Sequence, residues 1–383
     1  MKAKEIIKKI FYALGSYQLA LILIGFVLCL LFISIAIPQK GFFTLSEISL
    51  WEKENPGIGF IANLLDFYNI FQSYLFLSIV ALLAVNILLC TIIKIIPLQN
   101  ILKLKGSQRI RVYGFITVHI SLLVLLTATF ISSGYKMTGS LVLTENQSFI
   151  DEEKNYQYLA KGALRKKEHS GIMIRQKKID SYYQEGKYHV RTDSYFEIID
   201  KNNVATRAIS KINDPYVFDD YAFTIIEVGY SPEIMIYDTV NQRQMANAFV
   251  ALKTSNISNY RSYSDYLDLD FLKKRLNISV MPAHKEENGK IIKTGENIVN
   301  PIMFVEIEDN KGSRKKLGYI KLGEKIKIGS YDLYFMNLRR WNSFTIIDDP
   351  GYVLAAWALY IFVIGLMIRY FPDIKSWYKV ENS

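Results

Sequence analysis

The chain has 383 residues, which is enough for two or three domains, and half of them are hydrophobic. Its mean hydropathy of +0.13 is high for a soluble protein and indicates a membrane protein with a sizeable water-exposed part. The sequence has only two cysteines, Cys29 and Cys90, both in apolar segments, which excludes a disulfide framework, a cysteine-rich zinc site and a Cys-x-x-Cys-His haem attachment motif. The net charge of +10 does not indicate a nucleic-acid partner, because basic residues flank the apolar segments.

The N-terminal 37 residues combine a basic segment with a long apolar one. In residues 1–16, the isoleucines at positions 6, 7 and 10 and the lysines are expected on opposite faces of a helix. This pattern is typical of a basic amphipathic helix that lies along an anionic membrane surface. A plain basic flank of the first span is the alternative. A cleavable signal peptide is the competing interpretation of residues 17–37. The apolar run is too long for one, and no small-x-small cleavage site follows it. We therefore expect a retained membrane anchor.

Three further apolar segments, 71–96, 113–133 and 350–371, are long enough to cross a bilayer as helices. Lysine and arginine are concentrated around the connector 97–112 and at both ends of the chain, whereas acidic residues outnumber them in 38–70. The positive-inside rule then places the termini and the connector in the cytoplasm. Residues 38–70, expected as short interfacial helices, and residues 134–349 lie on the other side of the cell (inner or plasma) membrane in this interpretation.

Residues 134–349 show the alternation of half-buried strands rather than helical periodicity. Ile320, Leu322, Ile326 and Ile328 alternate with lysines, which predicts one strand that resumes after a Gly-Ser turn. Residues 261–275 are the segment most typical of a helix. Further strands are expected at 140–144, 171–175, 195–199, 222–228, 233–237, 276–281 and 302–308. About ten strands in a sandwich or in two packed sheets are predicted.

The sequence therefore predicts a membrane α+β protein with four transmembrane helices and a large β-rich extracytoplasmic domain between the third and the fourth. The expected segments are a basic amphipathic cytoplasmic segment (1–16), the first span (17–37), an extracytoplasmic interfacial loop (38–70), the second span (71–96), a basic cytoplasmic connector (97–112), the third span (113–133), the β-rich domain (134–349), the fourth span (350–371) and a cytoplasmic tail (372–383).

The third span carries an ionisable residue, His119, whose presence in a bilayer costs several kcal/mol unless it is compensated. On a helical wheel it is surrounded by large apolar residues, Phe115, Leu122, Leu123, Leu126 and Phe130. The opposite face holds small residues that allow close helix packing in lipid, Gly114, Thr117, Ser121, Ala128 and Ser132. This surrounding suits a flat apolar ligand with a central metal. A histidine that bonds a carbonyl or hydroxyl for packing alone is the alternative.

No other residue pattern indicates chemistry. His169, His189 and His284 are too far apart in sequence to claim as a metal cluster, and each is expected to be a surface histidine or one with satisfied hydrogen bonds. Asp268 and Asp270 form a lone Asp-x-Asp, which is weak evidence for a metal. Phosphate-binding loops, nucleophile elbows and His-Glu-x-x-His helices are absent from the sequence.

Four blocks of sequence carry a family resemblance. They are residues 37–39 (IPQ), which close the first span, residues 64–94 around the second, residues 118–148 around the third and residues 348–371 around the fourth. Together they resemble the ResB, or CcsB, family of cytochrome c biogenesis proteins. The resemblance covers all four spans but is thin across residues 150–300. It implies the system II pathway, in which a ResB-like subunit pairs with a CcsA or ResC subunit that carries a tryptophan-rich haem motif.

The resemblance also implies what the chain handles and where. Haem b is carried across the membrane and delivered to reduced Cys-x-x-Cys-His motifs of apocytochrome c, with thiol-reducing proteins as further partners. The family's third-span histidine, implicated as an axial ligand of haem iron, maps onto His119. Arg109 and Arg111 are hypothetical partners of the haem propionates; plain positive-inside topology is the alternative explanation of those charges.

The role expected from the resemblance is a haem-handling subunit that supports a cytochrome c haem lyase complex. No catalytic residue is assigned to this chain, and the sequence does not decide whether it contributes to thioether formation. A second hypothesis is a membrane-anchored scaffold whose ectodomain recruits apocytochrome or a thiol-reducing partner without binding haem. A transporter or sensor is disfavoured, because four spans with a single polar intramembrane residue make a poor solute path.

Overall fold

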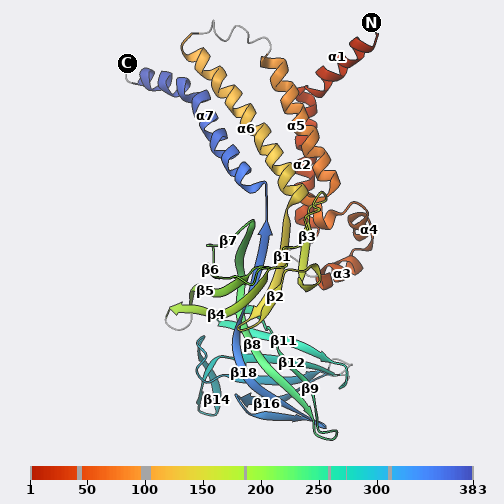
Figure 1. The fold of residues 1–383 in the computed structure, drawn as a ribbon, viewed down its shortest axis with the longest axis vertical. Coiled ribbons are helices and arrows are strands. Elements are labelled where there is room, and N and C mark those ends of the chain that lie inside the picture. Colours follow the sequence, from red (N-terminus) through yellow and green to blue (C-terminus); the bar gives the residue numbers. More distant parts are fainter. Residues whose placement is uncertain are drawn as a thin grey trace. The chain divides into compact units, whose positions relative to one another are not determined.

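The computed structural model describes residues 2–40, 45–95, 105–184, 188–257, 260–272, 274–308 and 313–381. The chain divides into two compact units. The first comprises Met1–Gly139, Tyr158–Lys167 and Ile347–Ser383, and the second comprises Ser140–Gln157 and Glu168–Ile346. Figure 1 shows the long helices, which belong to the first unit, and the strands, most of which belong to the second.

Four helices in the described part of the chain are long and apolar enough to cross a membrane, as predicted. They are α2 (Tyr17–Ala36), α5 (Tyr74–Ile95), α6 (Ser107–Tyr135) and α7 (Tyr352–Glu381). Each of the four predicted spans coincides with one of these helices, although α6 and α7 extend beyond their predicted apolar cores. The structure thus contains the membrane-spanning elements that the sequence predicts, without fixing their orientation. The first half of the predicted basic connector (97–112) lies outside the described residues, which resume at Lys105, and from Ser107 onward the connector belongs to α6.

Shorter helices accompany the spans. They are α1 (Lys2–Leu14), α3 (Leu45–Glu54), α4 (Pro56–Leu64) and the 3₁₀ helix η1 (Phe67–Gln72). The turn between α1 and α2 is fixed by Asn86 of α5, a residue only 1% exposed, whose side-chain amide donates to the carbonyls of Leu14 (2.5 Å) and Ser16 (2.9 Å). The Ser16 hydroxyl also accepts from the Leu19 N–H and caps α2. The polar groups exposed by this turn are therefore satisfied within the helices.

Most helices of the first unit, though not α1 or α7, contribute to one apolar cluster. Its buried members come from α2, α3, α4, η1, α5 and the residue after α2: Leu30, Ile37, Ile48, Ala62, Phe67, Tyr68, Ile70, Phe76 and Val80. Leu126 and Phe130 of α6 pack against it. Gln39 adds a polar tie, because its side-chain amide donates to the carbonyls of Ile37 (3.0 Å) and Phe67 (2.8 Å).

The second unit contains most of the strands. In chain order the strands are β1 (Met137–Thr144), β2 (Ser148–Ile150), β3 (Tyr158–Lys161), β4 (Met173–Gln184), β5 (Tyr188–Ile199), β6 (Ala205–Lys211), β7 (Tyr216–Phe218), β8 (Tyr221–Asp238), β9 (Arg243–Phe249), β10 (Lys253–Ile257), β11 (Tyr260–Leu269), β12 (Lys274–Met281), β13 (Ala283–Glu287), β14 (Lys290–Gly295), β15 (Ile302–Glu308), β16 (Arg314–Lys321), β17 (Lys325–Ile328) and β18 (Tyr331–Asp348). They follow α6 and precede α7 in the chain.

These strands form several sheets rather than one sandwich. Within the second unit, one sheet has the order β1-β18-β8-β7, with β17 and β9 added to β18 and β8. A second has the order β10-β11-β12-β15-β16, a third β2-β4-β5-β6, and β13 pairs with β14 alone. The largest core includes Ile234, Ile278, Val305 and Phe335, all at most 3% exposed. The predicted large β-rich domain is confirmed, but it holds eighteen labelled strands in the described residues instead of about ten.

Most predicted strands are present, and three predictions need correction. Residues 222–228 and 233–237 were expected as separate strands but belong to one continuous strand, β8, despite Pro232 between them. The expected single strand over residues 320–328 is instead the end of β16 and all of β17, separated by a turn in which Gly323 has φ +83°. Only a glycine adopts that backbone conformation without strain, and it ends the alternation.

The predicted helix at 261–275 is wrong: these residues form β11 and the start of β12, with Asp268 opposite Arg275 in the antiparallel register. The Arg275 guanidinium donates to both Asp268 carboxylate oxygens (2.7 and 3.1 Å) and lies 3.9 Å from the centre of the Tyr266 ring. Tyr263 on the opposite face is 1% exposed. The cross-strand pairing therefore decides the conformation of a segment whose local composition suits a helix.

Candidate functional site

His119 lies on α6, in the candidate span that the sequence singled out, and is half-buried. Its Nδ1 lies 2.9 Å from the carbonyl oxygen of Phe115, one helical turn earlier. Because a carbonyl only accepts, the ring must carry its proton on Nδ1, which leaves the lone pair of the neutral imidazole on Nε2. The Phe115 ring centre is 3.9 Å from that of the imidazole. The arrangement holds the ring in one orientation.

The opposite face of α6 packs against α7 along small residues, as the sequence predicts. A Cβ atom added to Gly114 would lie 2.4 Å from the backbone nitrogen of Arg369, and one added to Gly365 would lie 3.0 Å from Val118. Further along, a Cβ on Gly351 would lie 2.4 Å from the carbonyl oxygen of Ala128. The two helices therefore run antiparallel (Figure 1). Their backbones are in close contact at these glycines, a packing that only small residues permit in a membrane.

These contacts show which neighbours the His119 face of α6 is turned toward and which it is turned away from. Leu126, seven residues after His119 and on the same helical face, packs against the apolar cluster of α2, η1 and α5. Gly114 and Ala128 face α7 instead. The imidazole consequently lies on the side of α6 away from its contact with α7.

One of the two basic residues at the start of α6 singled out from the sequence, Arg109, contacts a tyrosine of the same helix. Arg109 donates from Nε to the hydroxyl of Tyr113 (3.1 Å), and its guanidinium carbon lies 5.6 Å from the centre of that ring. This local pair leaves the predicted contact of Arg109 or Arg111 with haem propionates untested.

Each of the three histidines outside the spans makes a hydrogen bond, but the prediction of a fully satisfied ring fails for His169, whose buried Nε2 has no hydrogen-bond partner in the described residues. His189 contacts the Thr192 hydroxyl (2.7 Å), and His284 donates from Nδ1 to the carbonyl of Asn300 (2.6 Å). His169 donates from Nδ1 to the Asp151 carboxylate (2.8 Å). Among the described residues, no group of three or more His, Cys, Asp or Glu side chains is placed to hold a metal ion.

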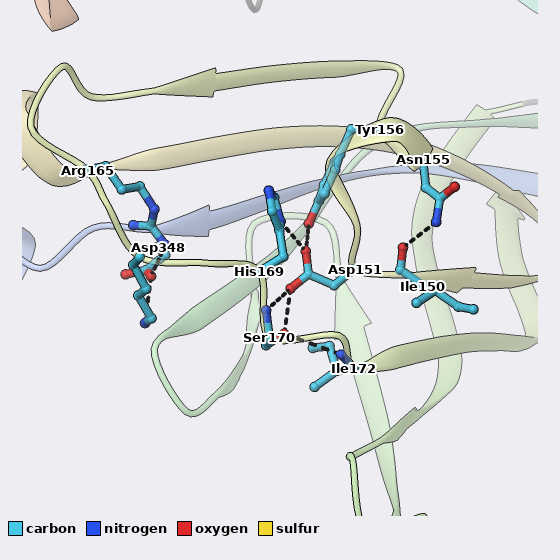
Figure 2. Close-up of polar contacts among 10 residues, drawn as sticks. Ile150, Asp151, Asn155, Tyr156, Arg165, His169, Ser170, Ile172 and Asp348 are labelled. Carbon is cyan, nitrogen blue, oxygen red and sulfur yellow. Dashed lines mark hydrogen bonds and ion pairs between the residues drawn. The ribbon is translucent and has the colours of Figure 1, made fainter.

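Asp151 is the centre of a polar cluster in the second unit that the sequence did not reveal (Figure 2). Its side chain is 2% exposed, and its Oδ1 accepts from the Tyr156 hydroxyl (2.7 Å) as well as from His169. Its Oδ2 accepts from the backbone N–H (2.7 Å) and the hydroxyl (2.5 Å) of Ser170. Burial raises the pKa of this carboxyl, but the hydrogen bonds from Ser170, Tyr156 and His169 outweigh burial and hold the pKa below its ordinary value of 3.8.

A pH dependence follows from this lowered pKa. A carboxyl that binds its proton less tightly in the folded state stabilises the fold above its unfolded pKa, and this contribution is lost as the pH falls through the folded value. We expect the free energy of unfolding to fall below about pH 4. The Asp151→Asn variant, measured by denaturant titration in detergent at several pH values, should show a weaker acid dependence than the wild type. Equal slopes would contradict the assignment to Asp151.

In the first unit, a second buried ionic group surrounds the residues that lead into α7. Nη2 of Arg165 lies 2.7 Å from Oδ2 of Asp348, and these side chains are 4% and 5% exposed. Lys167 also donates to Asp348 (3.0 Å). The neighbouring Asp349 accepts from the Ser132 hydroxyl (2.8 Å) and lies 3.6 Å from the amine of Lys136. These contacts connect the end of α6 to the start of α7.

Comparison with known proteins gives one family. The sequence pattern of the ResB-like family matches residues 104–383, which include α6, all the labelled strands from β1 to β18, and α7. No curated protein sequence matches the chain. Three chains of solved structures match; one is titled "Cytochrome c Heme Lyase CcmF", with 11% identity and a TM-score of 0.29. That match covers 82% of this chain and 34% of the other, so the chain spans about a third of that protein's length.

The family match covers well over half of the chain, and it includes the α6 span with His119 and the α7 span packed against it. It agrees with the family indicated by the sequence blocks at the ends of the spans. The protein is a membrane protein of the ResB-like family.

Proposed function

We propose that the protein is a haem-handling subunit of a system II cytochrome c synthetase complex. In this role it helps to move haem across the membrane and to deliver it to Cys-x-x-Cys-His motifs of apocytochrome c. The orientation follows the positive-inside rule, with both termini cytoplasmic and the β-rich domain extracytoplasmic. Membership of the ResB-like family supports this role.

The observation that carries the proposal is the state of His119. Its Nδ1 donates to the Phe115 carbonyl, so Nε2 bears the lone pair that an iron ligand requires. A hydrogen bond on the second ring nitrogen is the usual companion of metal-binding histidines, because it fixes the tautomer and the ring orientation. The donor chemistry therefore fits haem iron, with His119 as one axial ligand. Haem, as the transported molecule, supplies the iron that His119 binds.

The partners are those that the resemblance to the ResB family implies. Trp51, Trp341, Trp357 and Trp377 are scattered in the sequence, so in this proposal the tryptophan-rich haem motif belongs to a CcsA- or ResC-like membrane subunit. Apocytochrome c and thiol-reducing proteins complete the proposed set. Within it, the chain supports the haem lyase reaction through haem binding rather than through a catalytic residue of its own.

The test is the absorption spectrum of the chain purified together with its tryptophan-motif partner. We expect a Soret band that His119→Ala weakens at least severalfold, while His189→Gln, a change in the β-rich domain, leaves it intact. Both variants should co-purify with the partner to the same extent. An unchanged Soret band in His119→Ala would remove His119 from this role and favour the membrane-anchored scaffold.

A further inference from the structure

One segment of the chain leaves the second unit and joins the first. Residues Tyr158–Lys167, which we call the strap, follow Gln157 and precede Glu168, both assigned to the second unit. The strap contains β3 and a loop without regular secondary structure. It is therefore a candidate for a covalent connection with a function of its own.

The tip of the strap is bonded to the end of α6. The Gly162 N–H donates to the carbonyl of Lys136 (2.8 Å), and the Leu164 N–H donates to the carbonyl of Gly134 (2.9 Å). A Cβ atom on Gly162 would lie 2.3 Å from the Gly134 carbonyl oxygen, so the two backbones touch. Glycine at 162 is thus a requirement of this contact.

The tip also reaches the two other helices of this unit that border α6. The hydroxyl of Tyr74, the first residue of α5, donates to the Ala163 carbonyl (3.1 Å). The Arg165 guanidinium donates to the carbonyl of Tyr135 (2.7 Å) and to Asp348 just before α7 (2.7 Å). A single loop thereby binds the start of α5, the end of α6 and the residues leading into α7.

The two ends of the strap are held by one carboxylate. Asp151 accepts from Tyr156, two residues before the strap, and from His169 and Ser170, just after it (Figure 2). The hydroxyl and backbone of Ser170 are nineteen positions from Asp151 in sequence. Loss of these bonds would loosen the residues on both sides of the strap at once, although β3 would keep its pairing with β1.

We propose that the strap is a positioning element that couples the Asp151 cluster to the helix that carries His119. Arg165 fixes its tip to α6 and α7, and Asp151 fixes its ends. A change in the hydrogen bonding of Asp151 then alters how firmly α6 is held. Only the consequence for haem rests on the proposed function, because the coupling itself concerns the backbone.

The test is hydrogen–deuterium exchange of the full chain in detergent micelles, without haem. Arg165→Gln should raise the exchange rates of the Gly162 and Leu164 amides by at least about tenfold, because the side chain that clamps the tip is shortened and uncharged. Asp151→Asn should raise the same two rates severalfold, although Asp151 bonds neither amide. Asp268→Asn, in an exposed ion pair of β11, is the matched control and should leave them unchanged.

The double variant Arg165→Gln/Asp151→Asn distinguishes coupled sites from two sites that hold the strap independently. Independent sites multiply their effects on an exchange rate, whereas coupled sites depart from the product, here by at least about threefold. If Asp151→Asn destabilises the fold so much that amides throughout the chain exchange fast, Ser170→Ala is used instead. This variant removes only the hydrogen bond from the Ser170 hydroxyl to Asp151. Unchanged tip amides in the Asp151 or Ser170 variant, or a double variant equal to the product, would overturn the proposal whether or not His119 binds haem.

Discussion

Asp348→Ala is expected to lower the free energy of unfolding by about 3–5 kcal/mol, because it leaves the buried guanidinium of Arg165 without its counter-ion. The two side chains are 4% and 5% exposed, so water does not replace the lost carboxylate. The Tyr135 carbonyl remains as an acceptor for Arg165, but it carries no full charge. Unfolding of the purified chain in a detergent titration measures the loss.

Two further variants separate burial from charge. Asp268→Ala breaks an ion pair whose side chains are 40% and 58% exposed, and it should cost no more than about 1 kcal/mol. Arg165→Leu combined with Asp348→Ala removes both charges and should recover much of the loss, since no buried charge is then left unpaired. A double variant as unstable as Asp348→Ala alone would contradict this account of the pair.

The parts of the fold predicted from sequence are those that depend on local patterns. The four spans follow from the length of their apolar runs, and the face of α6 that packs on α7 follows from Gly114 and Ala128 at helical spacing. The strand at 302–308 also has its predicted limits, since its apolar β-branched and aromatic residues favour a strand locally. These features require no knowledge of a distant partner.

The features that were missed depend on partners far away in the sequence. Arg165 and Asp348 are 183 positions apart, and nothing local marks either as buried. The 261–275 segment does not form the predicted helix because the pairing of β11 with β12 decides its conformation. The local composition of the segment does not indicate that pairing. At His119 the sequence predicts an imidazole among large apolar residues. The hydrogen bond from Nδ1 to the Phe115 carbonyl depends on the side-chain rotamer, which the sequence does not indicate. That bond determines which ring nitrogen carries the proton and which carries the lone pair.

The second large effect is expected at Gly114, on the α6 face that packs against α7. Gly114→Ala should destabilise the chain by about 2–3 kcal/mol, because the added Cβ would lie 2.4 Å from the Arg369 nitrogen and 2.6 Å from its Cα. Backbone atoms cannot rotate away, so the helices must separate at this end. His119 is five residues further along α6, so the Soret band of the assembled complex should also shift or weaken.

Gly25 on α2 provides the matched control, since a Cβ there would meet nothing within 4 Å. Gly25→Ala should leave stability unchanged or raise it by about 0.5–1 kcal/mol, because alanine restricts the unfolded chain more than glycine does. Chemical denaturation and the Soret spectrum are recorded for both variants. If Gly114→Ala behaved like Gly25→Ala, α6 and α7 would not be in backbone contact, and the assignment of His119 to the helix face away from α7 would lose its basis.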